Sequence, residues 1–248
     1  MPFISTSQLA SHESSNKRNS EENIPLKEPD NQYGRMTYWD ESYRQALNEP
    51  NGEDEAIVFS WYSGWQDIQP FFTELTPLQD NPRILVPGIG NDGCIRDMFD
   101  YGYKHLSAFD YAPEGVECAK QIMGERVQLM DDLRVADCRE LPYYDDSSFD
   151  VVFDKGTLDS IYLSGGMDKV LSGKHLGMAV SELRRVLKPG GIMFSVTAAC
   201  VDSIQKSFDE CNMNKEAWEQ LRDGSLYITE DGYTSNNVDA TVLVWKKI

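Results

Sequence analysis

The chain has 248 residues, of which 40% are hydrophobic, and its formal net charge is −18. The length fits one domain with a sizeable core, and the acidic charge argues against a nucleic-acid partner, because such partners are bound by neutralising phosphates with Lys and Arg. The five cysteines form no Cys-x-x-Cys pair, which argues against a disulfide framework or a zinc site and fits a reducing compartment.

The first 35 residues are rich in Ser, Asn, Glu and Lys, a composition that buries too little apolar surface to offset the entropy of ordering. We expect residues 1–35 to be a disordered tail and residues 36–248 to form the single domain. The sequence contains no apolar run of about 18 residues and no secretory signal at its start. We therefore expect a soluble, cytoplasmic protein with no membrane partner, and we find no signal for an oligomeric state.

Two aromatic segments precede the first predicted strand. Residues 38–43 open a short helix, and a loop rich in glycine and acidic residues follows at residues 49–55. A second aromatic run at residues 59–65 leads into another helix, which ends before Pro77. The apolar face of that helix repeats at three- and four-residue steps through Ile68, Phe71, Phe72 and Leu75.

Strands and helices alternate from residue 84 onward, a pattern typical of a mostly parallel sheet with helices on both faces. The predicted strands cover residues 84–86, 106–109, 133–135, 149–154 and 192–197. The predicted helices lie at residues 94–101, from about 113, and around 175–187, and a turn at residues 188–191 precedes the fifth strand. The sequence therefore predicts an α/β fold.

The C-terminal part is predicted to contain one helix at residues 214–221 and two strands at residues 225–229 and 240–245. A final pair of strands fits an antiparallel edge on an otherwise parallel sheet of seven strands. In such sheets, ligands bind in the crevice beyond the carboxyl ends of the strands, where the strand order reverses.

The first strand runs into a glycine-rich turn, Val86-Pro-Gly-Ile-Gly-Asn-Asp-Gly93, and Asp110 closes the next strand twenty positions after Gly90. Gly88 and Gly90 allow a tight turn and a close approach to a ligand, and the following helix offers unpaired N–H groups. The Asp110 carboxylate can accept hydrogen bonds from ribose hydroxyls. These features predict an adenosine site, and a strand-to-helix turn without a ligand is the alternative.

Two more acidic residues end later strands. Asp137 is predicted to accept a hydrogen bond from an adenine amine, with the backbone N–H of Cys138 beside the ring; the alternative is a turn carboxylate that binds local N–H groups. Asp154 is predicted to face the gap between cofactor and substrate as the catalytic carboxylate, and a cap for the next segment is the alternative. The three histidines match no metal-ligand spacing, so we expect no metal site.

These motifs resemble those of class I S-adenosylmethionine-dependent methyltransferases from residue 38 to residue 248. The glycine turn is similar to the first motif of that family, Asp110 to its ribose acid, Asp137 to its adenine acid, and Leu187-Lys-Pro-Gly-Gly191 to the turn before its fifth strand. Phe153-Asp-Lys-Gly-Thr-Leu-Asp-Ser160 and Tyr38-Trp-Asp-x-x-Tyr43 are similar to a subgroup that includes lysine methyltransferases of translation elongation factor 1A. The resemblance implies a Rossmann-like methyltransferase sheet and S-adenosyl-L-methionine as the methyl donor.

The resemblance also implies which residues contact the donor, and the glycine and strand-end arguments add Gly90 and Asp154. The implied contacts are Trp39, Tyr43, Gly88, Asp110, Tyr111, Asp137, Cys138 and Lys155. The face of Trp39 or Tyr43 would stabilise the sulfonium by about 0.5–2 kcal/mol if it lies over the charge, and core packing is the alternative. Phe59 stands where relatives carry a Tyr, so a hydroxyl contact is lost, and Tyr162 is expected to form a wall for the acceptor.

Three functions are compatible with this sequence. The run at residues 154–159 and the aromatic N-terminal segment favour a protein-lysine N-methyltransferase whose protein substrate is a candidate translation factor. The Val-Pro-Gly opening of the glycine turn also resembles thiol and halide methyltransferases, so a small-molecule N-, S- or O-methyltransferase is the alternative. The third is a binding module without catalysis. A nicotinamide enzyme of the usual build would need a substrate domain, which does not fit in this length.

Overall fold

The structure is a computed structural model that describes residues 29–48, 58–211, 217–225 and 240–248. The strands are β1 Ile84–Pro87, β2 Leu106–Asp110, β3 Asp132–Val135, β4 Phe149–Lys155, β5 Leu187–Thr197, β6 Trp218–Ser225 and β7 Thr241–Lys247. The α-helices are α1 Met36–Asn48, α2 Trp65–Leu75, α3 Cys94–Tyr101, α4 Pro113–Met123, α5 Thr157–Leu163, α6 Lys169–Val186 and α7 Val201–Cys211. Short 3-10 helices occur at η1 Gln32–Gly34, η2 Leu78–Asp80 and η3 Gly124–Leu129.

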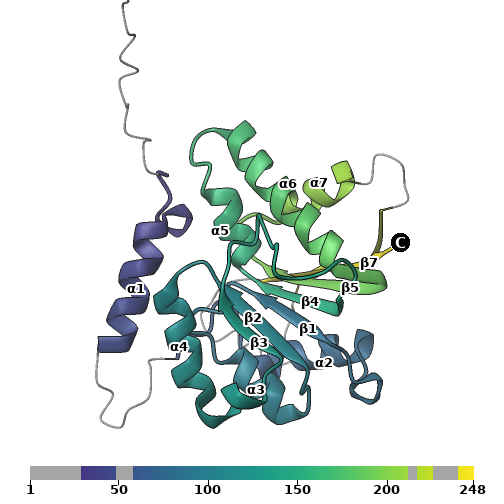
Figure 1. The fold of residues 1–248 in the computed structure, drawn as a ribbon. Helices are drawn as coiled ribbons and strands as arrows, with labels where there is room; N and C mark the ends of the chain where they lie inside the picture. The colour runs from purple at the N-terminus through teal and green to yellow at the C-terminus, as the bar shows by residue number, and fades with distance from the viewer. Residues whose placement is uncertain (1–28, 49–57, 212–216, 226–239) are drawn as a thin grey trace, which may run out of the picture.

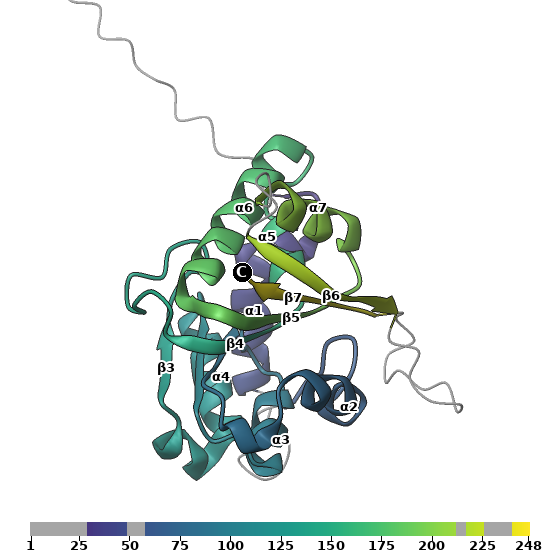
Figure 2. The same cartoon turned by 90° about the vertical axis from the view of Figure 1, so that its right-hand side faces the viewer.

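The strands form a seven-stranded sheet in the order β3-β2-β1-β4-β5-β7-β6. Strands β1 to β5 pair in parallel, whereas β7 pairs antiparallel with both β5 and β6 (Figure 2). The strand order reverses between β1 and β4. The predicted mostly parallel sheet with an antiparallel edge is therefore confirmed.

Helices cover both faces of the sheet because alternate strand residues point to opposite sides. On one face, Ile84 and Val86 of β1 pack with side chains of α2, α3 and α4. On the other, Leu85 packs with side chains of α5, α6 and α7. Figure 1 shows these three helices together on that face of the sheet. At the outer edge of the molecule, α1 lies against α4 (Figure 1), and its residues Tyr43 and Ala46 are buried.

The C-terminal prediction was partly wrong. Residues 218–221, assigned to a helix, belong to strand β6, and the helix of this region lies earlier, at α7. These residues form a strand because pairing with β7 satisfies their backbone hydrogen-bonding groups and buries Trp218 against Phe208 of α7. The other predicted positions, 214–216 and 226–229, lie outside the described residues, as do residues 1–28 of the predicted tail and the loop at 49–55.

Two further details concern the elements around the site. The predicted turn at residues 188–191 interrupts the pairing of β5, where Phe149 opposes Leu187 and Val151 opposes Ile192. Helix α5, which no pattern predicted, starts two residues after the end of β4.

Among the described helices, none combines the length and the apolar character needed to cross a bilayer.

Candidate functional site

A cavity of about 1500 Å³ lies at the carboxyl ends of β1 to β4, where the strand order reverses. Its walls include η1 and α1, three aromatic residues of the segment 58–63 (Phe59, Trp61 and Tyr62), the glycine turn, the residues after β2 and β3, and the start of α5. We call residues 58–63 the strap. Because small-molecule sites typically measure about 300–1,000 Å³, this cavity has room for a nucleoside and part of a second molecule.

Gly88 and Gly90 shape the turn that forms the cavity floor. Their φ angles are +59° and +46°, in the region that favours glycine. A Cβ atom at Gly88 would lie 2.2 Å from Oγ1 of Thr157, and one at Gly90 would lie 2.5 Å from the hydroxyl of Tyr43. The positive φ angles and the close side chains therefore both require glycine at these two positions. Their contact with a donor stays a prediction.

Asp110 is buried at the end of β2 and lines the cavity. Its Oδ2 accepts hydrogen bonds from the N–H of Gly90 at 3.0 Å and from the Tyr43 hydroxyl at 3.4 Å, and its Oδ1 accepts one from the N–H of Ala112 at 2.9 Å. Burial raises the pKa of Asp110 to about 6, although the two backbone hydrogen bonds oppose the shift. The predicted neighbourhood of glycine turn and acidic residue is thus confirmed.

Helix α1 brings the predicted aromatic residues to the same wall. Trp39 stacks on Tyr43 with ring centroids 6.0 Å apart, and its Nε1 donates to the carbonyl of Tyr33 at 2.9 Å. Burial raises the pKa of the Tyr43 hydroxyl well above its usual value, so this group stays protonated. Tyr111 anchors the helix start, because its hydroxyl donates to the carbonyl of Met36 at 2.8 Å. The rings therefore line the cavity and also pack α1 against α4 and the residues that follow β2.

Asp137 and Cys138 line the cavity beyond β3. The Asp137 carboxylate binds the guanidinium of Arg139 through Nε at 3.0 Å and Nη2 at 2.6 Å. Burial acts to raise the pKa of Asp137, but the hydrogen bonds from Arg139 outweigh it, and the net shift is downward. Asp137 is thus a charged carboxylate at the predicted place, and it already has a cationic partner that the sequence argument did not foresee.

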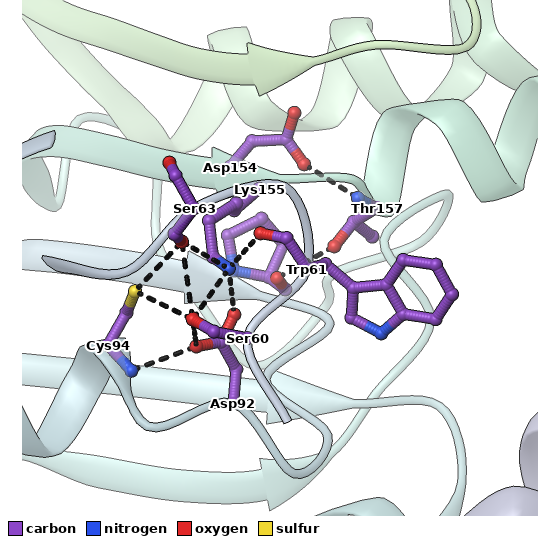
Figure 3. A network of polar contacts seen from close by, with 9 residues as sticks. Ser60, Trp61, Ser63, Asp92, Cys94, Asp154, Lys155 and Thr157 are labelled. Atoms are coloured by element: carbon purple, nitrogen blue, oxygen red, sulfur yellow. Dashed lines mark hydrogen bonds and ion pairs between the residues drawn. The ribbon is translucent and has the colours of Figure 1, made fainter. Parts of the chain in front are cut away.

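Lys155 connects the strap to the glycine turn (Figure 3). Its Nζ donates to the carbonyl of Trp61 at 2.5 Å and to that of Ser63 at 3.2 Å, and it pairs with Oδ2 of Asp92 at 2.5 Å. The Lys155 side chain is only 3% exposed. It therefore holds the strap by direct contacts, whereas the predicted contact with the methyl donor stays a prediction.

Asp154 does not occupy the predicted position between cofactor and substrate. Its side chain is fully buried and is not part of the cavity wall. Its Oδ1 accepts from the N–H groups of Thr157 and Leu158 at 3.1 and 3.2 Å, and its Oδ2 accepts from the Ser195 hydroxyl at 2.5 Å. The alternative role as a cap fits this geometry, since the carboxylate satisfies the first N–H groups of α5.

A neighbouring carboxylate that sequence reasoning left without a role lies in the cavity wall. Asp159 accepts hydrogen bonds from the Tyr62 hydroxyl at 2.8 Å and from the Thr197 hydroxyl at 2.6 Å. It belongs to the Asp-Lys-Gly-Thr-Leu-Asp run, so a signal existed, but nothing in the spacing showed its partners. Tyr162, expected to form the acceptor wall, is not among the lining residues, and its ring contacts Lys169 instead.

Known proteins that are similar to this chain in sequence are methyltransferases. Residues 85–195 match a methyltransferase domain family. The chain is 35% identical over 179 residues to EEF1A lysine methyltransferase 4 of Mus musculus, covering 70% of this chain and 65% of that protein. It is 28% identical over 225 residues to EEF1A lysine methyltransferase 2 of Danio rerio, covering 86% and 87% of the two chains. The chain thus spans about two thirds of the mouse relative.

A solved structure shows the same fold. The N-methyltransferase NodS from Bradyrhizobium japonicum, in complex with S-adenosyl-L-homocysteine, matches 84% of this chain and 98% of its own with a TM-score of 0.53. The two sequences are 14% identical, so the likeness concerns the arrangement of the sheet and helices.

Proposed function

This chain belongs to the class I S-adenosylmethionine-dependent methyltransferases, and we propose that it transfers a methyl group from S-adenosylmethionine to a lysine side chain of a protein. The names of the mouse and zebrafish relatives make translation elongation factor 1A the first candidate substrate. The observation that carries the proposal is the cavity in which the glycine turn, the buried Asp110 and the aromatic rings of α1 meet.

The residues in the cavity fit the donor. Gly88 and Gly90 line the cavity, and without a Cβ they let the turn pass close to Thr157 and Tyr43. Oδ1 of Asp110 has one protein donor and can accept another, and the long 3.4 Å contact from Tyr43 can be exchanged for a ribose hydroxyl. Trp39 and Tyr43 offer ring faces to a cation.

When bound, S-adenosylmethionine supplies the methyl group on a sulfonium, which makes the sulfur a good leaving group. The protein's tasks are alignment of the acceptor and exclusion of water, and positioning can contribute about 7–11 kcal/mol in favourable cases. A lysine acceptor, with an ordinary pKa near 10.4, must also lose a proton before it attacks. The aromatic residues of α1 and the strap provide a less polar wall along the path of the acceptor side chain.

A protein substrate is favoured over a small molecule by the mouth of the cavity. Several residues that line it are exposed to solvent, among them Met36 at 56%, Phe59 at 42% and Met167 at 79%. The cavity thus reaches the surface, so a lysine side chain can enter while its protein stays outside. The names of the curated relatives point in the same direction.

We place this reaction in the cytoplasm. Cys94, Cys118, Cys138 and Cys200 are free thiols, as a reducing compartment requires. Translation factors work in the same compartment, so enzyme and candidate substrate would meet there.

A labelled-donor assay tests the proposal. The chain is incubated with S-adenosylmethionine labelled in the methyl group and with either elongation factor 1A or a fractionated lysate, and labelled proteins are analysed by mass spectrometry. We expect label on lysine, and we expect its loss in Asp110→Ala, for which calorimetry with S-adenosylhomocysteine should show weakened donor binding. Label confined to small molecules would favour the alternative, and donor binding without any transfer would favour a silent binding module.

A further inference from the structure

We propose that Asp159 and the Tyr62 hydroxyl form a subsite for a primary ammonium group, which rests on the proposed function by serving as the place where the acceptor lysine binds. The subsite lies in the cavity wall between the strap and the end of β5. Its ligand class is an alkylammonium cation, such as the end of a lysine side chain.

The first argument is an uncompensated buried charge. Asp159 is 2% exposed, and its protein partners are the hydroxyls of Tyr62 and Thr197 and, at 3.4 Å, the N–H of Ala198. None of the ion pairs found among the described residues involves Asp159. A buried carboxylate without a cation is costly, whereas the nearby Asp92 has Lys155 as its cation. A cation brought by a ligand would compensate Asp159.

The second argument is the position of Asp159 relative to the donor site. The predicted ribose and adenine acids, Asp110 and Asp137, lie at the ends of β2 and β3, on one side of the strand-order reversal. Asp159 binds Thr197 at the end of β5, on the other side. Asp110 and Asp137 would hold the adenosine of the donor at β2 and β3, which would leave the space beside Asp159 for the acceptor.

The third argument is the conformation of Tyr62. Its φ angle is +65°, a region that costs a bulky residue of order 1–3 kcal/mol, and such strained residues cluster at functional sites. The ring lies against Gly156, where a Cβ would approach it to 3.2 Å. Lys155 fixes this strap conformation by binding the carbonyls on both sides of Tyr62. The strained strap thus delivers one hydroxyl to Asp159.

The chemistry of the pair suits an ammonium ligand. Burial raises the pKa of the Tyr62 hydroxyl far above its usual value, and the Asp159 charge adds to the rise, so the hydroxyl keeps its proton and donates it to Asp159. The phenol oxygen can then accept a hydrogen bond from the ammonium, and the carboxylate can accept another. The neutral analogue, an alcohol, offers one donor and no charge.

Binding of n-butylammonium, a mimic of the lysine side chain, tests the subsite without requiring turnover. The full chain is saturated with S-adenosylhomocysteine and titrated with n-butylammonium or with n-butanol, in wild type, Asp159→Asn and Tyr62→Phe. We expect the wild type to bind the ammonium and not the alcohol. We expect a loss of about 10- to 100-fold in Asp159→Asn and a smaller loss in Tyr62→Phe, while S-adenosylhomocysteine binds all three within about twofold.

Tyr144→Phe is the matched control. The Tyr144 hydroxyl also donates to an aspartate, Asp132, at 2.7 Å, but neither residue lines the cavity. This variant should bind n-butylammonium as the wild type does. If Asp159→Asn does not fold, the n-butylammonium affinities of Tyr62→Phe and Tyr144→Phe are compared instead. The subsite predicts weaker binding in Tyr62→Phe alone.

Equal ammonium affinity in wild type and variants, or none in the wild type, would overturn the subsite. A parallel loss of S-adenosylhomocysteine affinity would overturn it as well, because Asp159 would then belong to the donor site. The labelled-donor assay reports separately on the proposed function, so failure of one proposal does not decide the other.

Discussion

The two halves of the cavity are built in different ways. On the β1–β3 side, the acidic residue and the glycine turn come from neighbouring segments, since Gly90 and Asp110 are 20 positions apart and the Gly90 N–H donates to the Asp110 carboxylate. On the β4–β5 side, remote segments meet: the side chains of Tyr62 and Asp159 are 97 positions apart, and Lys155 binds the carbonyl of Trp61 across 94 positions. The first half is thus centred on a short motif, to which α1 adds Tyr43, whereas the second half depends on contacts between remote segments throughout.

This difference predicts where substitutions act. Changes in the glycine turn should affect donor binding most, because Gly88 and Gly90 line the cavity beside Asp110. Changes in the strap and its anchor should affect folding as well, because they hold distant segments together.

The largest effect is expected at the strap anchor. Lys155→Met removes the cation of Asp92 and the donor for the carbonyls of Trp61 and Ser63, so we expect a loss of about 3–5 kcal/mol in the free energy of unfolding. Lys188→Met is the matched control, since Lys188 pairs with Asp150 at 2.7 Å at the surface and should cost less than about 1 kcal/mol. Urea unfolding measures both. Similar losses in the two variants would contradict the special role of Lys155.

The next effect concerns the glycine turn. Gly90→Ala places a Cβ 2.5 Å from the Tyr43 hydroxyl at a positive φ, so we expect donor affinity to fall by about 100-fold. Gly173→Ala is the matched control, because nothing lies within 4 Å of its Cβ and it should stabilise α6 by about 0.5–1 kcal/mol. Calorimetry with S-adenosylhomocysteine measures the affinities. Unchanged binding in Gly90→Ala would mean that the donor lies elsewhere.

A third effect depends on pH. Burial raises the pKa of Asp154 to about 7, so the folded protein binds a proton at this carboxyl more tightly than the unfolded chain does. The stability that this proton contributes is fully present below about pH 4 and is lost as the pH rises through 7. An Asn side chain keeps the acceptor for the N–H groups of α5 without this loss. We expect Asp154→Asn to gain roughly 1–2 kcal/mol relative to wild type between pH 5 and pH 8. Thermal unfolding at both values checks this, and a constant difference would refute it.

The smallest effect is expected at Asp137. Its carboxylate is 40% exposed and already bound to Arg139, so Asp137→Asn should weaken donor binding by only about three- to fivefold. Asp146→Asn, which alters another arginine-bound carboxylate outside the cavity wall, should leave donor binding unchanged. A loss at Asp137 as large as that at Gly90 would place more of the adenine recognition in this side chain.

The same contrast explains what the sequence could predict. The mostly parallel sheet with its antiparallel edge, the glycine turn and the place of Asp110 beside it could be predicted from short motifs and from the alternation of strands and helices. The Asp159 subsite could not be predicted, because its partners in the strap and at the end of β5 are brought together only by the tertiary fold. Asp154 was misplaced for a related reason: a position at a strand end does not tell which way the side chain points.

The C-terminal helix was misassigned because local propensity was outweighed by strand pairing. Trp218 opens β6 and faces Phe208 of α7, a contact visible only in the assembled sheet. The amphipathic spacing of Ile204 and Phe208, both buried, is a signal that could have located α7.

A crystal structure of the chain with S-adenosylhomocysteine tests most directly how the cavity is divided. We predict the ribose at Asp110, the adenine beside Asp137, and the sulfur directed toward the side of the cavity formed by Asp159 and Tyr62. A ligand bound in the reverse orientation, with its sulfur toward β3, or bound outside this cavity would contradict the division into a donor half and an acceptor half.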